Sequence, residues 1–282
     1  SNQTVTSGHW RWIQENKQAE LISALDNSST DKILEILQNL FRNSASHGLV
    51  SRHTYQELTE LDDDKKNEFV YMLARDLERG IELSLFPDIS YVNFPNIGNP
   101  WGIFFNSFLI HPDTPKFLHH AYILRKWAFR YSNRPTILEI GGGFGGTLCY
   151  LLKVKRGGYC YINCDLPVTL IIFYAFVREF HKMLDVELRV GVFDDRITNS
   201  ECRQYDVILT PASNKENITC YVDMVYNANS LSEIPESEIL NYFEIINKAG
   251  IFFHQNSNLL GHDNIDLYGG QELPADLFPV SD

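Results

Sequence analysis

Apolar and polar positions follow two different patterns along the chain. In the first half, apolar residues recur at helical spacing, in segments that begin at Thr30, Asp62 and Thr114. Threonine suits the start of a helix because its hydroxyl can accept a hydrogen bond from an unpaired N–H group. A loop rich in turn-forming residues covers residues 94–100. The pattern predicts a mainly helical region over residues 1–115.

In the second half, short apolar runs alternate with amphipathic segments. Strands are predicted at residues 136–140, 159–164, 186–192, 205–210, 221–226 and 250–254, with helices at 147–153, 168–183 and from Pro235. This alternation predicts an α/β domain over residues 116–282, with a parallel, Rossmann-like sheet and helices on both faces. Few residues follow the last predicted strand, so we expect either an abbreviated sheet or a chain that has been cut.

The strand at 136–140 runs into the most informative segment of the chain, which has five glycines within residues 141–146. Strand, glycine turn and helix form the nucleotide-binding unit of open α/β sheets. Each glycine costs backbone entropy on folding, so a turn without a ligand is a poor explanation of this run. Two ligand classes remain, because the segment satisfies both the dinucleotide pattern G-x-G-x-x-G and the pattern E-x-G-x-G-x-G of class I S-adenosylmethionine methyltransferases.

The acid Glu139, two residues before the first glycine, separates these two classes. A dinucleotide would place its pyrophosphate at the turn, where this carboxylate would repel it, whereas a sulfonium-bearing amino acid tolerates a nearby negative charge. We therefore predict S-adenosylmethionine as the cofactor. Asp165 ends the next strand, where an acid can bind the ribose hydroxyls or cap the following helix. The residues expected to bind the cofactor are Glu139, Gly141, Gly142, Gly143, Phe144, Gly145, Asp165, Leu166 and Asn229.

Composition excludes several other classes of protein. The net charge of −12 argues against a nucleic-acid partner, which requires a basic surface. The longest apolar runs are too short to span a membrane, and no basic segment followed by an apolar one opens the chain. The five cysteines contain no Cys-x-x-Cys pair, which favours structural thiols in a reduced, cytoplasmic protein.

Three segments in order, at residues 139–146, 165–170 and 223–233, resemble the bacterial sugar O-methyltransferase family. The resemblance covers roughly the second half of the chain. It implies a class I methyltransferase domain that transfers a methyl group from S-adenosylmethionine to a sugar hydroxyl of a polysaccharide or a glycosylated metabolite. A methyltransferase for another small-molecule hydroxyl or amine stays open, as do a non-catalytic nucleotide-binding or interaction module of the same fold and an NAD-dependent oxidoreductase. A homodimer also stays open.

Methyl transfer to a hydroxyl requires alignment of the reacting atoms and removal of the hydroxyl proton. Two candidate bases follow the ends of predicted strands, Glu233 and His254. Glu233 could instead favour the start of the next helix through the helix dipole, and His254 could be an ordinary hydrogen-bonded histidine.

Substrate contacts are expected from His111, Asn227 and Ser230. The helical first half should close over the carboxyl edge of the sheet, with His111 and the loop at 95–100 near the substrate. Glu233, His262 and Asp263 could assemble a divalent metal site, but no spacing requires one, and we predict none.

Overall fold

The computed structural model describes residues 7–50, 54–82 and 88–256, and its centre is a parallel six-stranded sheet. The strands are β3 (Thr136–Ile140), β4 (Cys160–Asp165), β5 (Val190–Val192), β6 (Val207–Pro211), β7 (Met224–Ala228) and β8 (Ile251–Gln255). Their order across the sheet is β5-β6-β4-β3-β7-β8, and every adjacent pair is parallel. The predicted Rossmann-like sheet is therefore confirmed.

The strand order reverses direction at β3, which has β4 on one side and β7 on the other. In open α/β sheets a ligand site forms at such a switch point, beyond the carboxyl ends of the strands. Of the two strand candidates after α8 (Pro167–Met183), β6 pairs directly with β4, as expected for the strand nearer the cofactor. The other candidate shortens to β5 at the edge of the sheet.

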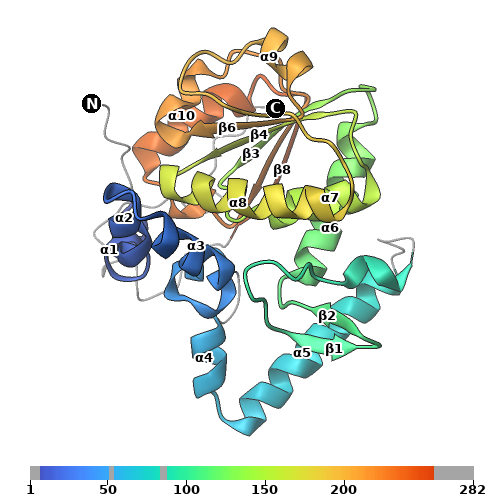
Figure 1. Cartoon of the computed structure of the whole chain (residues 1–282). Helices are drawn as coiled ribbons and strands as arrows, with labels where there is room; N and C mark the ends of the chain where they lie inside the picture. Colours follow the sequence, from blue (N-terminus) through green and yellow to red (C-terminus); the bar gives the residue numbers. More distant parts are fainter. Residues whose placement is uncertain (1–6, 51–53, 83–87, 257–282) are drawn as a thin grey trace.

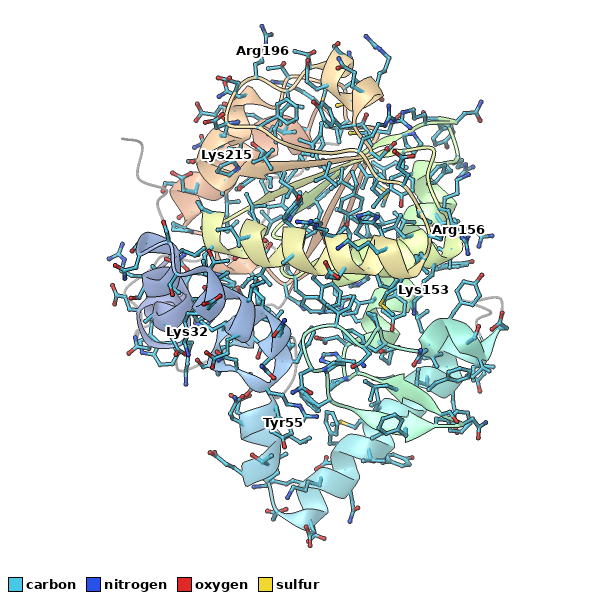
Figure 2. The ribbon with its side chains drawn as sticks, viewed as in Figure 1. Lys32, Tyr55, Lys153, Arg156, Arg196 and Lys215 are labelled. Atoms are coloured by element: carbon cyan, nitrogen blue, oxygen red, sulfur yellow. The ribbon has the colours of Figure 1, made fainter. Side chains whose placement is uncertain are left out.

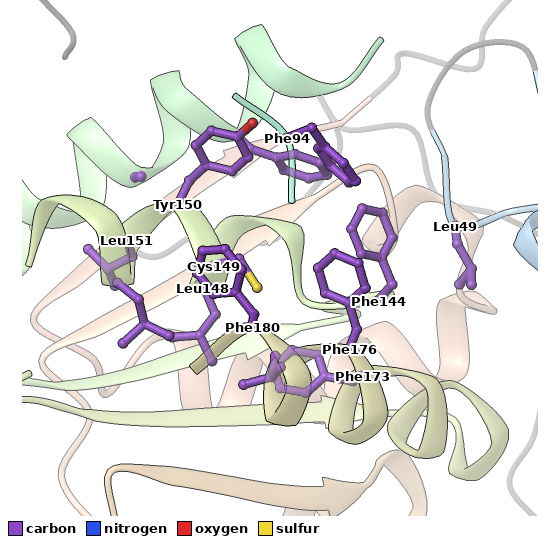
Figure 3. Packing of buried hydrophobic residues seen from close by; sticks show 14 of the residues in the cluster. Leu49, Phe94, Phe144, Leu148, Cys149, Tyr150, Leu151, Phe173, Phe176 and Phe180 are labelled. Atoms are coloured by element: carbon purple, nitrogen blue, oxygen red, sulfur yellow. The ribbon is translucent and has the colours of Figure 1, made fainter. Parts of the chain in front are cut away.

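Helices cover both faces of the sheet (Figure 1). One core joins the sheet to α6 (Thr114–Ala128), α7 (Gly146–Val154) and α8, and a second core joins the opposite face to α9 (Asn199–Gln204) and α10 (Glu236–Ile246). Figure 3 shows part of the first core, where Phe144 packs beside Phe173 and Phe176. The buried residues of α10 recur at helical spacing: Ile239, Tyr242, Phe243 and Ile246.

The N-terminal region is mainly helical, as predicted. Its helices are α1 (Gly8–Asn16), α2 (Ala19–Asp26), α3 (Thr30–Gln38), α4 (Tyr55–Glu60) and α5 (Asp63–Glu82). Short 3-10 helices occur at η1 (Leu40–Arg42), η2 (Ser44–Ser46) and η3 (Ile89–Val92), and later in the chain at η4 (Ala212–Asn217) and η5 (Leu231–Glu233). Thr30 and Thr114, which were expected to cap helices, are instead the first residues of α3 and α6. The N-cap positions are Ser29 and Asp113.

A small hairpin was not predicted. Its strands are β1 (Ile103–Phe105) and β2 (Phe108–Ile110), which pair antiparallel. Asn106 and Ser107 form the turn, with φ of 46° and 73°. Strands of three residues are too short to show a recognisable alternation of apolar and polar residues. This turn also lacks the glycine that usually marks a tight hairpin.

One hydrophobic core crosses the predicted domain boundary at residue 115, and polar contacts accompany it. Figure 2 labels Lys153 on α7, whose ammonium donates to the backbone carbonyls of Tyr91 (3.1 Å) and Asn93. Tyr150 on the same helix donates to the carbonyl of Val92 at 3.2 Å. The boundary itself stays a prediction, but these contacts hold the N-terminal region against α7. No helix in the described parts of the chain is long and apolar enough to cross a membrane.

Candidate functional site

A pocket of about 620 Å³ lies at the carboxyl edge of the sheet, at the switch point. This volume lies in the range of small-molecule and cofactor sites. The glycine turn and the ends of β4 and β7 form the floor of the pocket. Residues of η4 and α10 line one side, and residues of α1 and of the segment after η2 form its roof. Figure 1 shows α1 and α2 beside one end of α8, far in sequence from the glycine turn. Residues of α1 and the segment after η2 thus line the pocket at the carboxyl edge, while the wider role of the N-terminal region as a substrate cover stays a prediction.

The glycine turn has a backbone shape that other residues rarely adopt. Gly141, Gly143 and Gly145 have φ of 72°, 57° and 88°. A Cβ on Gly142 would overlap the carboxylate of Glu139, whereas a Cβ on Gly143 would meet only the Leu49 carbonyl oxygen, at 3.9 Å. The turn therefore exposes bare backbone to the pocket at Gly143, as a closely bound ligand requires.

Two buried acids lie against this turn. Glu139 accepts a hydrogen bond from the Tyr161 hydroxyl at 2.8 Å, and burial raises the pKa of its carboxyl to about 8. Asp165 accepts from the backbone N–H groups of Gly143 (3.0 Å) and Leu166 (2.7 Å). Those bonds favour the carboxylate, but burial outweighs them and raises the pKa of Asp165 to about 7.

Asp165 does not cap α8. The residue at the N-cap position is Leu166, which makes no side-chain capping bond. The carboxylate instead joins the glycine turn to the end of β4, and it lines the pocket. Its binding of ribose stays a prediction. Among the predicted cofactor residues, only Gly145 does not line the pocket, because it packs against Val177 and Phe173.

The two lysines that line the pocket lie beside carboxylates. Lys116 Nζ is 3.6 Å from Asp113, and Lys215 Nζ is 2.6 Å from Glu238. Figure 2 labels Lys215, whose partner Glu238 belongs to α10. The turn thus has two acids next to it, which repel a pyrophosphate when they are ionised. Thr169 also lines the pocket, and its buried hydroxyl has no hydrogen-bond partner among the described residues.

Two of the predicted substrate contacts, Asn227 at the end of β7 and Ser230 after it, have different surroundings. Asn227 is fully buried and outside the pocket lining. Its amide donates to the Ile140 carbonyl at 2.7 Å and accepts from the Leu231 N–H at 3.2 Å, so it supports the turn after β7. Ser230 does line the pocket, with its hydroxyl donating to the same Ile140 carbonyl at 2.9 Å. Asn229, with φ of 62°, lines it too.

His111 is not at the pocket, and the loop at 95–100 is also absent from its lining. The imidazole is fully buried and stacks on Phe94 with 4.5 Å between ring centroids, beside Phe41 and Trp101. Burial lowers its pKa to about 4. The expectation that His111 and this loop lie near the substrate is therefore not met, because the ring packs within the aromatic core of the N-terminal region.

The two candidate bases have different positions. Glu233 lines the pocket and accepts a hydrogen bond from the Trp10 indole N–H at 2.9 Å. His254 does not line it, because its ring stacks on Phe252 (4.9 Å) on the face of β8 that packs against α10. His262 and Asp263, considered for a metal site, lie outside the described residues. Within the described ranges, no group of three or more metal-ligating side chains is arranged to hold a metal ion.

The sequence pattern missed the roof of the pocket. His9 and Trp10 of α1 and His47 and Leu49 after η2 all line it. The only signal was local, since Gly48 has φ of 77° and a Cβ there would lie 3.0 Å from the Trp10 ring. Nothing in the spacing of these residues indicates that Trp10 contacts Glu233 of η5, 223 positions later.

Several solved structures that are similar to this chain are methyltransferases. They include geranyl diphosphate C-methyltransferase from Streptomyces coelicolor in complex with S-adenosyl-L-homocysteine, with 11% identity, a TM-score of 0.31 and coverage of 48% of this chain and 42% of that one. The tRNA (uracil-54, C5)-methyltransferase of Pyrococcus abyssi, also with S-adenosyl-L-homocysteine, has 16% identity, a TM-score of 0.32 and coverage of 53% and 32%. Mitomycin 7-O-methyltransferase MmcR has 12% identity, a TM-score of 0.31 and coverage of 52% and 40%.

The chain thus spans less than half the length of each of these proteins, and the likeness concerns the fold alone. No family model matches the chain, and no curated protein does. The sugar O-methyltransferase family therefore stays a prediction.

Proposed function

We propose that the protein is an S-adenosylmethionine-dependent O-methyltransferase that acts on a sugar hydroxyl. The observation that carries the proposal is the pair of buried acids, Glu139 and Asp165, against a glycine turn that opens into a pocket at the switch point. When these acids are ionised, they favour a cationic sulfonium nucleoside over a pyrophosphate.

The residues present fit this cofactor. Gly143 leaves room for close approach to the turn, and the Thr169 hydroxyl supplies a buried polar atom within the pocket. When bound, S-adenosylmethionine supplies an activated methyl group on a positively charged sulfur. The protein then has to align an acceptor oxygen with that methyl group, exclude water and remove the hydroxyl proton.

The acceptor end of the pocket would lie between the segment after β7 and the roof. Asn229, Ser230 and Glu233 line the pocket here, and Trp10 lines it next to Glu233, to which it donates its indole N–H. Amide, hydroxyl and carboxylate groups can hydrogen-bond sugar hydroxyls, and an aromatic ring can pack against the apolar face of a sugar ring. The choice of a sugar over another small hydroxyl compound rests on these groups together with the resemblance of the three sequence segments.

The five cysteines are buried free thiols, which supports the inference of a reduced, cytoplasmic compartment. A non-catalytic module of the same fold would bind the cofactor without turnover. The test is transfer of labelled methyl from S-adenosylmethionine to a panel of methyl glycosides, with Gly143→Val as the control variant that blocks the turn. Labelled glycoside with the natural chain and none with the variant would support the proposal. Cofactor binding with no transfer to any glycoside, but with transfer to a phenol or amine, would overturn the sugar assignment.

A further inference from the structure

Two histidines share the roof of the pocket, and neither follows a strand. His9 belongs to α1, His47 follows η2, and both line the pocket. Burial, and after it the charge of a protonated His47, lowers the pKa of His9. The methyltransferase half alone does not supply such groups at this place, since His254 lies outside the pocket lining.

The position of α1, which carries His9, is fixed by contacts of the neighbouring residue Trp10. Trp10 donates its indole N–H to Glu233 at 2.9 Å, which joins α1 to η5. Gly48 lies against the same Trp10 ring, since a Cβ there would be 2.9 Å from Ile13 and 3.0 Å from Trp10. His9 therefore lines the pocket from α1 above η5, whereas Glu139 and Asp165 belong to the floor. This is the side on which an acceptor hydroxyl would meet the cofactor methyl group.

The charge state of His9 suits proton removal. Burial is the main cause that lowers its pKa, followed by the nearby His47, so the imidazole is neutral near neutral pH. Burial also lowers the pKa of His47, opposed by Glu57, whose carboxylate is 3.9 Å from His47 Nε2, and supported by Lys17. Glu233 on η5 is the charged group that contacts Trp10, the residue next to His9. A neutral imidazole is a better base at this pH than a carboxylate, whose ordinary pKa is near 4.

We propose that His9 is the general base of methyl transfer, an inference that rests on the proposed function. In this step the acceptor oxygen forms a bond to the methyl carbon, and the carbon–sulfur bond breaks, leaving the electron pair on sulfur. The hydroxyl proton moves to a ring nitrogen of His9, which later releases it to solvent. Glu233 then acts as a positioning residue that holds Trp10, and through it α1, over the acceptor.

The test is the pKa of His9, measured by NMR titration of the full chain without ligand, with S-adenosylhomocysteine and with S-adenosylmethionine. A positive sulfur about 6 Å from the ring should lower the pKa of His9 by at least about 0.5 unit relative to the neutral sulfur, even at the dielectric constant of water. His119, which is exposed on α6 and outside the pocket lining, is the matched control and should titrate identically in both complexes. Equal pKa values of His9 in the two complexes would overturn the proposal.

Turnover gives the second measurement. His9→Asn should reduce kcat for the best glycoside acceptor by about 10²- to 10⁴-fold, remove the acid limb of the pH profile and leave the Kd of S-adenosylhomocysteine unchanged. His119→Asn should leave all three unchanged. A fully active His9→Asn variant would refute the role of His9 while leaving the proposed function intact. Failure of the natural chain to bind either sulfur compound would instead refute the proposed function.

Discussion

Binding of S-adenosylmethionine should strengthen as pH rises, because the cation favours ionised acids next to the glycine turn. Without ligand, burial holds the pKa of Glu139 at about 8 and that of Asp165 at about 7. Glu139 is then largely protonated below its pKa and must lose its proton to face a sulfonium or an ammonium group as an anion. The pKa of each acid should therefore fall on binding, and the complex should release protons.

The magnitude follows from these two pKa values. Between about pH 6 and pH 8, the ionised fraction of a group with a pKa of about 8 rises about 50-fold, and that of a group with a pKa of about 7 rises about 10-fold. The affinity should rise by up to about 50-fold if binding requires ionised Glu139, and further if it also requires Asp165. Glu139→Gln keeps an acceptor for the Tyr161 hydroxyl and removes the titration, so it should reduce the rise to the roughly 10-fold that Asp165 supplies.

The assay is isothermal titration calorimetry at several pH values, in two buffers of different ionisation enthalpy. The buffer dependence of the measured enthalpy gives the number of protons released. A Kd for S-adenosylmethionine that is constant across this range, with no proton release, would refute the reasoning. An undiminished pH dependence in Glu139→Gln would refute the assignment to Glu139 and leave Asp165 as its source.

Four substitutions test other parts of the site. Gly143→Val should abolish binding of S-adenosylhomocysteine while the circular dichroism spectrum persists, because the added side chain enters the pocket; unchanged binding in the folded variant would remove the turn from the site. Asp165→Ala should weaken cofactor binding by about 1.5–3 kcal/mol in calorimetry, whereas a fall in Tm with unchanged Kd would assign Asp165 a structural role alone. Glu233→Gln retains an acceptor for Trp10, so Tm and turnover should stay within about twofold of the natural chain, and a loss approaching 10²-fold would make Glu233 the base. His111→Ala should lower Tm, because it leaves a cavity beside Phe94, without changing the Kd of the cofactor; a weakened Kd at unchanged Tm would contradict its place in the core.

The sheet and the floor of the site could be predicted because their signals are local. The apolar run of β3, the glycines after it and the acid at the end of β4 lie close together in sequence, and each limits the backbone directly. Parallel strands then bring their carboxyl ends to one edge, which places Glu139 and Asp165 together without further information.

The remaining assignments depended on side-chain direction and on contacts between distant segments. His254 ends the predicted strand, but alternation along β8 places it on the α10 side with Phe252. His111 lies just before a helix and looked available, yet its ring is enclosed by aromatic residues from separate parts of the N-terminal region. The contact between Trp10 and Glu233 spans 223 positions, which no local pattern encodes.

The most direct test of the central claim is calorimetric titration of the full chain with S-adenosylhomocysteine and, separately, with NAD⁺. Glu139 and Asp165 lie where a pyrophosphate would meet the glycine turn, and no lysine of the pocket lining is free of a neighbouring carboxylate. The account predicts saturable one-to-one binding of S-adenosylhomocysteine, lost in Gly143→Val, and no measurable binding of NAD⁺. Binding of NAD⁺ in preference to S-adenosylhomocysteine would contradict it.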